Sequence, residues 1–319
     1  MRAWSELFRV SALFSVPGDA LAGAAAVGRG PGRGTAFAVG ASLCLYEAGM
    51  ALNDWADREE DAVDRPHRPI PSGRVSPAAA LGAAGVLTAA GLALAARAGR
   101  PALAVATGLA ATVWAYDLRL KHTKAGPAAM AAARSLDLLL GATAAGSGTA
   151  ATARGGADNV AAPGGFVRDA LPAALVLGAH TYGVTAVSRH EAQGGSTAVP
   201  LAVLATTAAL GTAVLTAGRA ARTQGPGEHR PTRPHHLTPA DLLLTAFTGA
   251  YLRTAGPPLL RAALNPSPPL TQRAVGGGIR AMIPLQAALA ARNGAPGSGL
   301  AVMALVPLAR ALARKVSPT

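Results

Sequence analysis

Four polar residues at the end of an apolar segment have types and spacing that suit metal chemistry. Asn53 and Asp54 come first, and Asp57 and Asp61 follow at intervals of three and four residues. If the apolar helix continues past Asn53, the three carboxylates lie within about 60° of one another on one face. Hard divalent cations such as Mg²⁺ prefer oxygen ligands and bridge protein carboxylates to phosphates. The spacing therefore indicates a cation site.

Arginines and prolines follow this acidic segment directly. Arg65, Arg68 and Arg74 stand within the sequence RPHRPIPSGRVS. A guanidinium group matches phosphate oxygens in a forked geometry, so carboxylates followed by arginines fit a metal-bridged diphosphate. The alternative is a solvated, charged helix end that the prolines stiffen.

The elements that must position these residues are long apolar segments, close to the roughly 20 residues that span a bilayer. Ten segments qualify when weak ones are included, and nine without the weakest: 10–28, 35–53, 75–96, 101–116, 127–153, 170–188, 192–218, 242–258, 274–291 and 300–312. Glycine and proline within such segments are tolerated in membranes. The pattern predicts an all-α, multi-pass membrane protein.

Composition excludes several other classes of protein. Hydrophobic residues make up 50% of the 319 residues and charged residues only 14%, against about 25% charged in soluble domains. A mean hydropathy of +0.31 argues against a disordered basic chain. The net charge of +13 is spread between apolar runs, so no basic patch for nucleic acid is expected. The single Cys44 excludes an intramolecular disulfide.

Lysine and arginine in the short loops predict the orientation, because cytoplasmic loops are enriched in both. With a cytoplasmic N-terminus, the inner loops up to residue 191 hold Arg2, Arg9, Arg58, Arg65, Arg68, Arg74, Arg119, Lys121, Lys124 and Arg189. The outer loops hold fewer: Arg29, Arg33, Arg97, Arg100, Arg154 and Arg168. We expect one domain over residues 1–319 in the cell membrane, with the acidic segment cytoplasmic and a flexible polar connector at 219–239. No cleavable signal peptide is expected.

The acidic segment resembles the first Asp-rich motif of the UbiA superfamily of intramembrane prenyltransferases, in register at Asn53, Asp54, Asp57 and Asp61. Residues 65–76 are similar to the stretch that follows the motif in that family. The resemblance covers roughly residues 5–315. It implies about nine helices around a central cavity, Mg²⁺ as cofactor, and transfer of a prenyl group from a prenyl diphosphate to a small acceptor, aromatic or other, within the membrane. Membrane lipid is a further expected partner.

A second feature of the family is a tyrosine followed by Leu-Lys at the end of the fourth span. Tyr116 and Lys121 reproduce it in YDLRLK. The resemblance thus implies a substrate-binding set of Asn53, Arg65, Arg68, Tyr116 and Lys121. The segments YDLRLKHTKAGP and SRHEAQGGS look most like the EboC-type branch of the superfamily.

The second Asp-rich motif of the family should lie at the end of the sixth span, where this chain reads SRHEA. Ser188 and Ala192 stand where acids are usual, Glu191 is the one matching carboxylate, and Arg189 is a basic residue between them. The resemblance implies metal ligation by Asp54, Asp57, Asp61 and Glu191, and catalytic roles for Asp54, Asp57, Asp61 and Arg189. The alternative for Arg189 and Glu191 is an ordinary interfacial pair.

Ionisable residues within the apolar segments usually face the interior of a helical bundle. Asp19, Glu47, Arg134 and Asp137 occupy such positions. Arg134 and Asp137, three residues apart, could form a salt bridge, which is favoured over a catalytic role for the pair. Glu47 lies seven residues before Asp54 on the same helical face, which suggests either a structural role or a base for the acceptor.

Three functions compete at this point. The first is Mg²⁺-dependent prenyl transfer. The second is a non-catalytic isoprenoid- or lipid-binding membrane protein of the same fold, suggested by the altered SRHEA segment. The third, a small-molecule transporter, is disfavoured because we find no convincing inverted repeats of the kind that many transporters carry.

Overall fold

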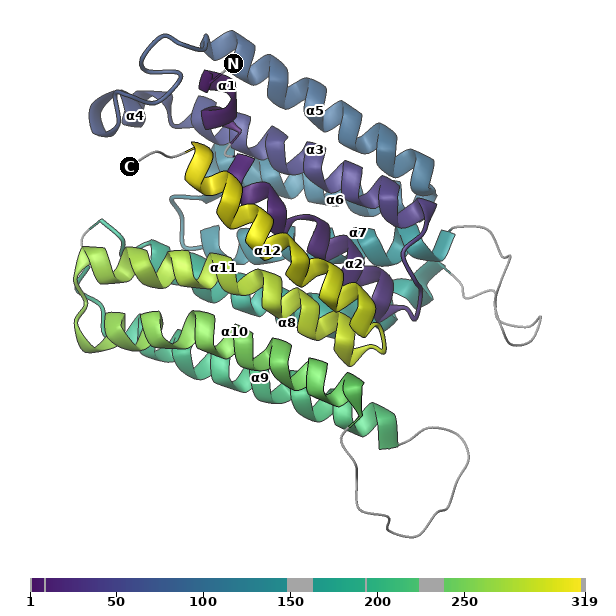
Figure 1. The fold of residues 1–319 in the computed structure, drawn as a ribbon. Coiled ribbons are helices and arrows are strands. Elements are labelled where there is room, and N and C mark those ends of the chain that lie inside the picture. The colour runs from purple at the N-terminus through teal and green to yellow at the C-terminus, as the bar shows by residue number, and fades with distance from the viewer. Residues whose placement is uncertain (1, 9, 148–162, 193, 224–237, 317–319) are drawn as a thin grey trace.

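The computed structural model describes the chain except residues 1, 9, 148–162, 193, 224–237 and 317–319, and every regular element in these described ranges is helical (Figure 1). In chain order the elements are α1 Arg2–Leu7, the 3₁₀-helix η1 Val10–Ser15, α2 Pro17–Ala26, α3 Arg33–Ala56, α4 Arg58–Asp64, α5 Pro77–Ala98, α6 Arg100–Ala115, the π-helical turn η2 Tyr116–Leu120, α7 Gly126–Ser147, α8 Pro163–Ser188, α9 Ala198–Thr223, α10 Pro239–Leu264, α11 Pro268–Arg292 and α12 Pro296–Val316. The expected all-α fold is confirmed.

Local sequence signals explain several helix ends. The Ser76 side chain caps α5 by accepting a hydrogen bond from the Ala79 backbone N–H at 3.2 Å, and Pro77 occupies the first turn. Between α5 and α6 stands Gly99 with φ +130°, a conformation that side-chain-bearing residues rarely adopt. These signals give the chain sharp turns between neighbouring helices.

The expected spans correspond to helices whose boundaries differ in places, and residues 148–153 of the 127–153 span lie outside the described residues. The 10–28 segment is divided into η1 and α2, and Pro17 stands in the first turn of α2. The 192–218 segment becomes helical only at Ala198. The 219–239 connector begins inside α9 and resumes at the N-terminus of α10; its central residues 224–237 lie outside the described residues.

Six helices in the described ranges are long and apolar enough to cross a membrane: Arg33–Ala56, Pro77–Ala98, Gly126–Gly146, Gly164–Ser188, Ala198–Gly218 and Pro268–Arg292. Shorter apolar helices lie at Leu13–Ala26 and Pro296–Pro307. The outer helices expose apolar side chains, for example Val86 on α5 (71% exposed) and Leu201 on α9 (53%). Such faces suit lipid, and the chain is an integral membrane protein. The number of crossings stays a prediction.

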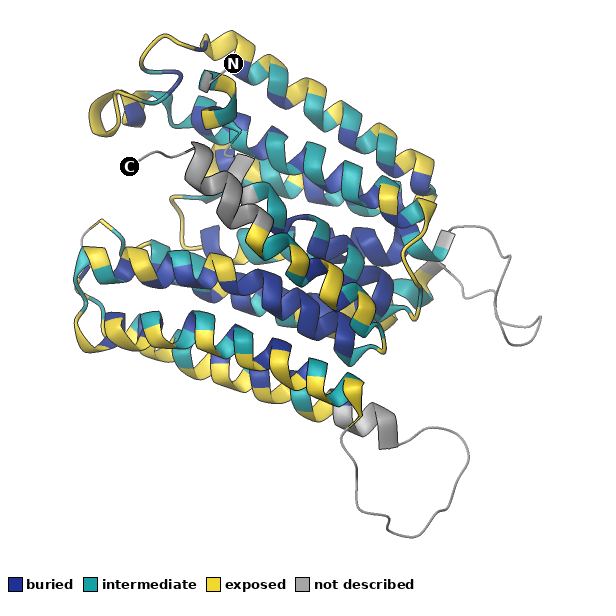
Figure 2. Cartoon of the chain, in the orientation of Figure 1, coloured by how far each residue is buried: buried dark blue, intermediate teal, exposed yellow. Residues whose placement is uncertain are grey.

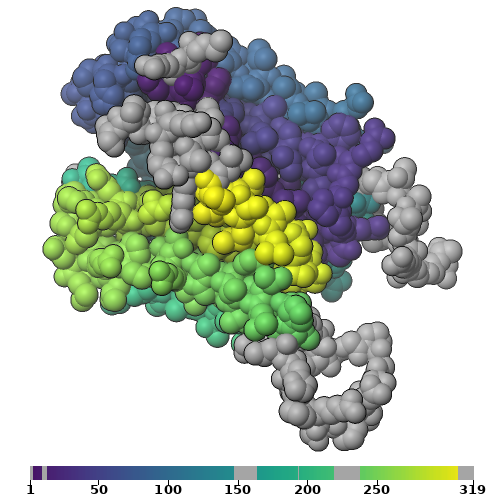
Figure 3. Space-filling view, in the orientation of Figure 1, coloured from purple at the N-terminus to yellow at the C-terminus, as the bar shows by residue number. Residues whose placement is uncertain are grey.

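The core of the bundle surrounds α11. Residues 281–291 of this helix are all buried, whereas the outward faces of α5, α9 and α10 are exposed (Figure 2). Helix α11 packs against α2, α8, α10 and α12. From one side, the surface of α12 lies between that of α2 and α3 and that of α10 and α11 (Figure 3).

Helix packing positions the residues singled out by sequence. Helix α3 packs on α5 and α7, and α7 packs on α2, α6 and α8. The segment containing α4 and the connections α6–α7, α8–α9 and α10–α11 lie at one end of the bundle, on the left in Figure 1. The acidic segment, the YDLRLK turn and the SRHEA segment thus meet at the same end; we call it the motif end.

Candidate functional site

The acidic segment does not continue as a single helix. Helix α3 ends at Ala56, and the backbone N–H of Asp57 donates to the Asn53 carbonyl at 2.9 Å. A separate short helix, α4, then begins at Arg58. The expectation that all three aspartates share one continuous helical face is therefore wrong, because the break at Asp57 divides them into two groups.

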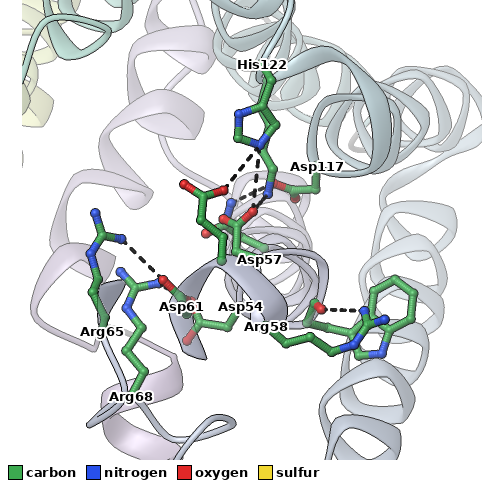
Figure 4. Close-up of polar contacts among 12 residues, drawn as sticks. Asp54, Asp57, Arg58, Asp61, Arg65, Arg68, Asp117 and His122 are labelled. Atoms are coloured by element: carbon green, nitrogen blue, oxygen red, sulfur yellow. Dashed lines mark hydrogen bonds and ion pairs between the residues drawn. The ribbon is translucent and has the colours of Figure 1, made fainter. Parts of the chain in front are cut away.

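Asp54 and Asp61 form the first group, held by arginine (Figure 4). Both are buried, at 4% and 2% exposed. One Arg68 nitrogen, Nη1, lies 3.3 Å from Asp54 Oδ1 and 2.7 Å from Asp61 Oδ2. Arg65 lies 3.5 Å from Asp61. Arg74 pairs with a glutamate of α1 instead, so two of the three expected arginines meet the acids.

Asp57 belongs to the second group and points to the connection between α6 and α7 (Figure 4). Its carboxylate accepts a hydrogen bond from the Lys121 ammonium. His122 Nε2 lies 3.9 Å from Asp57 and 4.0 Å from Glu60. Ligand atoms of Asp57, Glu60 and His122 lie within 4.8 Å of one another, a spacing that a metal ion could bridge. The sequence predicted Lys121 here but neither Glu60 nor His122.

The SRHEA segment contacts this end without reaching the aspartates directly. Arg189 donates a hydrogen bond to the Thr123 carbonyl. Glu191 is half-buried; burial raises the pKa of its carboxyl, and the Arg65 guanidinium lowers it in part. Arg65 therefore links Glu191 electrostatically with Asp61. Within the described structure, no ion pair joins Arg189 to Asp54, Asp57 or Asp61.

A cavity of about 400 Å³ lies inside the bundle and reaches the motif end, and we call that part of it the opening. Its lining there includes Asn53, Tyr116, Asp117 and Ser188. Apolar side chains line its middle, namely Leu45, Met50, Leu109, Val113, Met130, Val184, Val275, Ile279 and Met282. The three aspartates of the first motif are not among the lining residues, although Asp54 directly follows the lining residue Asn53.

Asp117 was missed by sequence reasoning, although it stands next to Tyr116. It is 5% exposed, and its Oδ1 accepts a hydrogen bond from Asn53 Nδ2 at 3.1 Å. The turn that carries it is π-helical, with the Lys121 N–H donating to the Tyr116 carbonyl at 3.0 Å. The position of an acid next to Tyr116 could have pointed to this residue. The π-helical geometry that directs Asp117 to the cavity cannot be predicted from the sequence.

A network of ions and hydrogen bonds lines the far end of the cavity. Arg134 Nη1 lies 3.0 Å from Asp19 Oδ2, and its Nη2 donates to Ser15 Oγ at 3.1 Å. Asp137 accepts a hydrogen bond from Ser42. On α3, Ser42 precedes Asn53 by 11 residues, which is about 16 Å along a helix axis.

Two expectations about the intramembrane ions need correction. The ion-pair partner of Arg134 in the described structure is Asp19 of α2, and not Asp137 on its own helix. Glu47 does not line the cavity. Both of its carboxylate oxygens are buried without a hydrogen-bond partner among the described residues, so it is not in place to act on an acceptor there.

The chemistry of the motif end fits a hard divalent cation. Carboxylates and the Asn53 amide supply oxygen donors, the ligand type that Mg²⁺ prefers. The chain's own Arg68 and Lys121 already balance Asp54 and Asp57, which indicates that the buried acids require positive charge. The neighbouring apolar cavity suits a hydrocarbon chain attached to an anion held at this end.

Comparisons with known proteins agree with the fold. Solved structures of UbiA homologs share the fold: one from Archaeoglobus fulgidus, described as bound to GPP and Mg²⁺, has a TM-score of 0.60 at 17% identity, covering 95% of this chain and 99% of that one. One from Aeropyrum pernix K1 has a TM-score of 0.59 at 17% identity, covering 84% and 96%.

Curated relatives share parts of the sequence. Digeranylgeranylglyceryl phosphate synthase of Methanopyrus kandleri is 41% identical over 128 residues, 39% of this chain and 45% of that protein. The protein of that name from Korarchaeum cryptofilum is 37% identical over 100 residues, 31% and 36%. The chain thus matches less than half the length of these relatives. The model of the UbiA prenyltransferase family matches residues 14–221, and the chain belongs to this family.

Proposed function

We propose that this protein transfers a prenyl group from a prenyl diphosphate to a small acceptor within the membrane, with Mg²⁺ as cofactor. One observation carries the proposal: acids and arginines gather at the opening of an apolar cavity inside a membrane bundle. Family membership and the GPP and Mg²⁺ described for the Archaeoglobus homolog support it.

The chain's residues divide the work by position. Arg65 and Arg68 hold the diphosphate at the motif end, together with Lys121, whose ammonium lies beside Asp57. Tyr116 and Asn53 line the opening through which the prenyl tail enters. The apolar wall holds the tail and excludes water that would capture the electrophilic carbon. Arg189, from the opposite segment, adds positive charge near Tyr116.

The reaction exchanges one bond for another. The bond between the first prenyl carbon and the diphosphate oxygen breaks, and diphosphate leaves with the bonding electrons. The acceptor forms a bond to that carbon and loses a proton. Bound Mg²⁺ would supply charge that stabilises the leaving group. The Mg²⁺ ion would be held by Asp54, Asp57 and Asp61. Glu191 is the ligand proposed from the SRHEA segment.

The acceptor and the branch of the family belong to the proposal as well. The name shared by the curated relatives supports an acceptor built on glycerol phosphate. The YDLRLKHTKAGP and SRHEAQGGS segments instead resemble the EboC-type branch, for which an aromatic or other small acceptor remains open. An assay should therefore offer both acceptor classes.

The test uses the purified full-length protein in lipid nanodiscs with geranyl diphosphate, Mg²⁺ and either acceptor class. We expect pyrophosphate release and a prenylated product by mass spectrometry. Excess EDTA should abolish both, and added Mg²⁺ should restore them, because the leaving group loses its counter-charge without the metal. Product formation that is unchanged in EDTA would contradict the proposed cofactor.

A second function is favoured by one observation, the absence of acids at Ser188 and Ala192. A bundle with one intact motif could bind isoprenoid diphosphates without converting them. In that case geranyl diphosphate would bind in a Mg²⁺-dependent way and be recovered intact after prolonged incubation. Any prenylated product from the purified protein would exclude this alternative.

We also infer that the chain forms a single domain in the cell membrane. The distribution of lysine and arginine supports a cytoplasmic position for the motif end. The exposed Ser72 lies at the motif end, and the exposed Gly30 lies in the loop between α2 and α3. In a Cys44→Ser background, Ser72→Cys should resist a membrane-impermeant thiol reagent added to intact cells, whereas Gly30→Cys should be labelled. The reverse pattern would overturn the orientation.

A further inference from the structure

The acids of the first motif are not the ones that face the cavity. Asp54 and Asp61 share Arg68, and Asp57 accepts from Lys121. A prenyl diphosphate with its tail in the cavity must place its first carbon at the cavity opening. The carboxylate that lines this opening is Asp117.

The local backbone directs Asp117 to this position. It stands on the π-helical turn between α6 and α7, and such turns occur frequently at functional sites. Its Oδ1 accepts from Asn53 Nδ2. Its Oδ2 lies over Gly49, where an added Cβ would approach to 4.0 Å. Gly49 and Asn53 both line the cavity, so both oxygens of Asp117 lie on the cavity side of α3.

Asn53 is oriented by the same contact. Because its Nδ2 donates to Asp117, its carbonyl oxygen Oδ1 is left to accept or to bind a cation. This pairing places the Asn53 amide and the Asp117 carboxylate next to each other in the cavity lining. Both are ligand types that Mg²⁺ prefers.

The opposite segment leaves room for such a role. Ser188 lines the cavity, but its hydroxyl donates to the Thr185 carbonyl at 2.9 Å and it carries no charge. Glu191 interacts with Arg65, outside the lining. The Tyr116 hydroxyl interacts electrostatically with Asp57, Asp117 and Arg189. The acidic segment, the YDLRLK turn and the SRHEA segment therefore all contribute charge near Tyr116. Figure 4 draws Asp117 together with Asp57, Asp54 and Asp61 among the polar contacts of the motif end.

We propose that Asp117 is a ligand of the divalent cation that binds the substrate diphosphate, and that it supplies the cavity-side carboxylate which the SRHEA segment lacks. This inference rests on the proposed prenyl transfer, and it adds a ligand from the YDLRLK turn. The site is then assembled from α3, α4 and the π-helical turn, with Arg189 adding charge from the far side.

The test measures cation binding apart from turnover. The probe is Mn²⁺, added to full-length protein in nanodiscs with inorganic pyrophosphate at a fixed concentration. Electron paramagnetic resonance measures the concentration of free Mn²⁺ in the sample. Asp117→Asn keeps the shape and the acceptor for Asn53 but removes the charge. We expect Mn²⁺ affinity to fall by at least about 10–100-fold, the loss typical of removing a group that only supports a metal ligand. Asp117→Glu should recover part of the loss.

Asp64→Asn is the matched control, because it removes one exposed acid from the end of α4. It should leave Mn²⁺ affinity unchanged. A structural role for Asp117 would instead lower the melting temperature of Asp117→Asn while Mn²⁺ affinity stays at the wild-type value. Wild-type affinity in Asp117→Asn overturns the proposal, and so does a wild-type protein that binds no Mn²⁺.

These outcomes separate the inference from the proposed function. If Mn²⁺ binds through Asp117 but no allylic diphosphate is converted, the proposed cation site is supported and the proposed transferase activity is contradicted. If turnover is found, and Asp54→Asn weakens Mn²⁺ binding while Asp117→Asn does not, the transferase activity is supported and the proposed role of Asp117 is contradicted.

Discussion

Replacing Asp54 by asparagine is expected to lower the rate of pyrophosphate release from geranyl diphosphate by about 10²–10³-fold, the range for removing one preorganised charge-stabilising group. Asp54 is nearly fully buried and shares Arg68 with Asp61. The substitution keeps the side-chain shape but removes a negative charge from the cation site. A steady-state assay that detects pyrophosphate measures the change directly.

The control for this experiment is Glu59→Gln, which removes an acid from the same short helix. Glu59 is 86% exposed in its side chain and pairs only with the neighbouring Arg58 in the described structure. The Glu59→Gln variant should release pyrophosphate at the wild-type rate. A double variant, Asp54→Asn with Asp57→Asn, that still releases pyrophosphate at the wild-type rate would contradict the assigned role of the motif.

Replacing Arg134 by methionine is expected to destabilise the protein by about 3–5 kcal/mol, because it leaves buried carboxylates without their cation. Asp19 is fully buried and ion-paired to Arg134 at 3.0 Å, and Gln286 donates to the same carboxylate at 2.7 Å. Methionine fills a similar volume but supplies no charge. The loss should appear as a lower melting temperature in nanodiscs.

The rescue experiment distinguishes charge from packing. If uncompensated charge is the cause, the double variant Asp19→Asn with Arg134→Met should recover most of the lost stability. Arg100→Met, at an exposed position at the start of α6, should melt like the wild type. Equal melting temperatures for the single and double variants would assign the loss to packing alone.

Most of the helical architecture could be predicted from the sequence, because long apolar runs in this chain have few alternatives to membrane helices. The break at Asp57 could not. The alternation of acids there is compatible with a continuous helix, and the ending of α3 at Ala56 depends on the contacts of the segment that follows. The same holds for α9, whose start at Ala198 follows a glycine-containing turn.

Residue type and spacing singled out the acids and Arg68 as candidates for the site, and the family resemblance added Lys121. Their pairing was not predictable, because it is decided by helices distant in sequence. Arg134 selects Asp19 from α2 over Asp137 on its own helix for this reason. Asp117 was missed because a π-helical turn changes the face on which a residue lies, and sequence periodicity assumes a regular helix.

The pairing of each first-motif acid with a cation of the chain itself has a consequence for biogenesis. Asp54 and Asp61 share Arg68, Arg65 also pairs with Asp61, and Asp57 pairs with Lys121. We therefore expect the bundle to insert and assemble without metal, with Mg²⁺ binding afterwards. A chelated preparation should be inactive yet melt at the same temperature as the untreated protein.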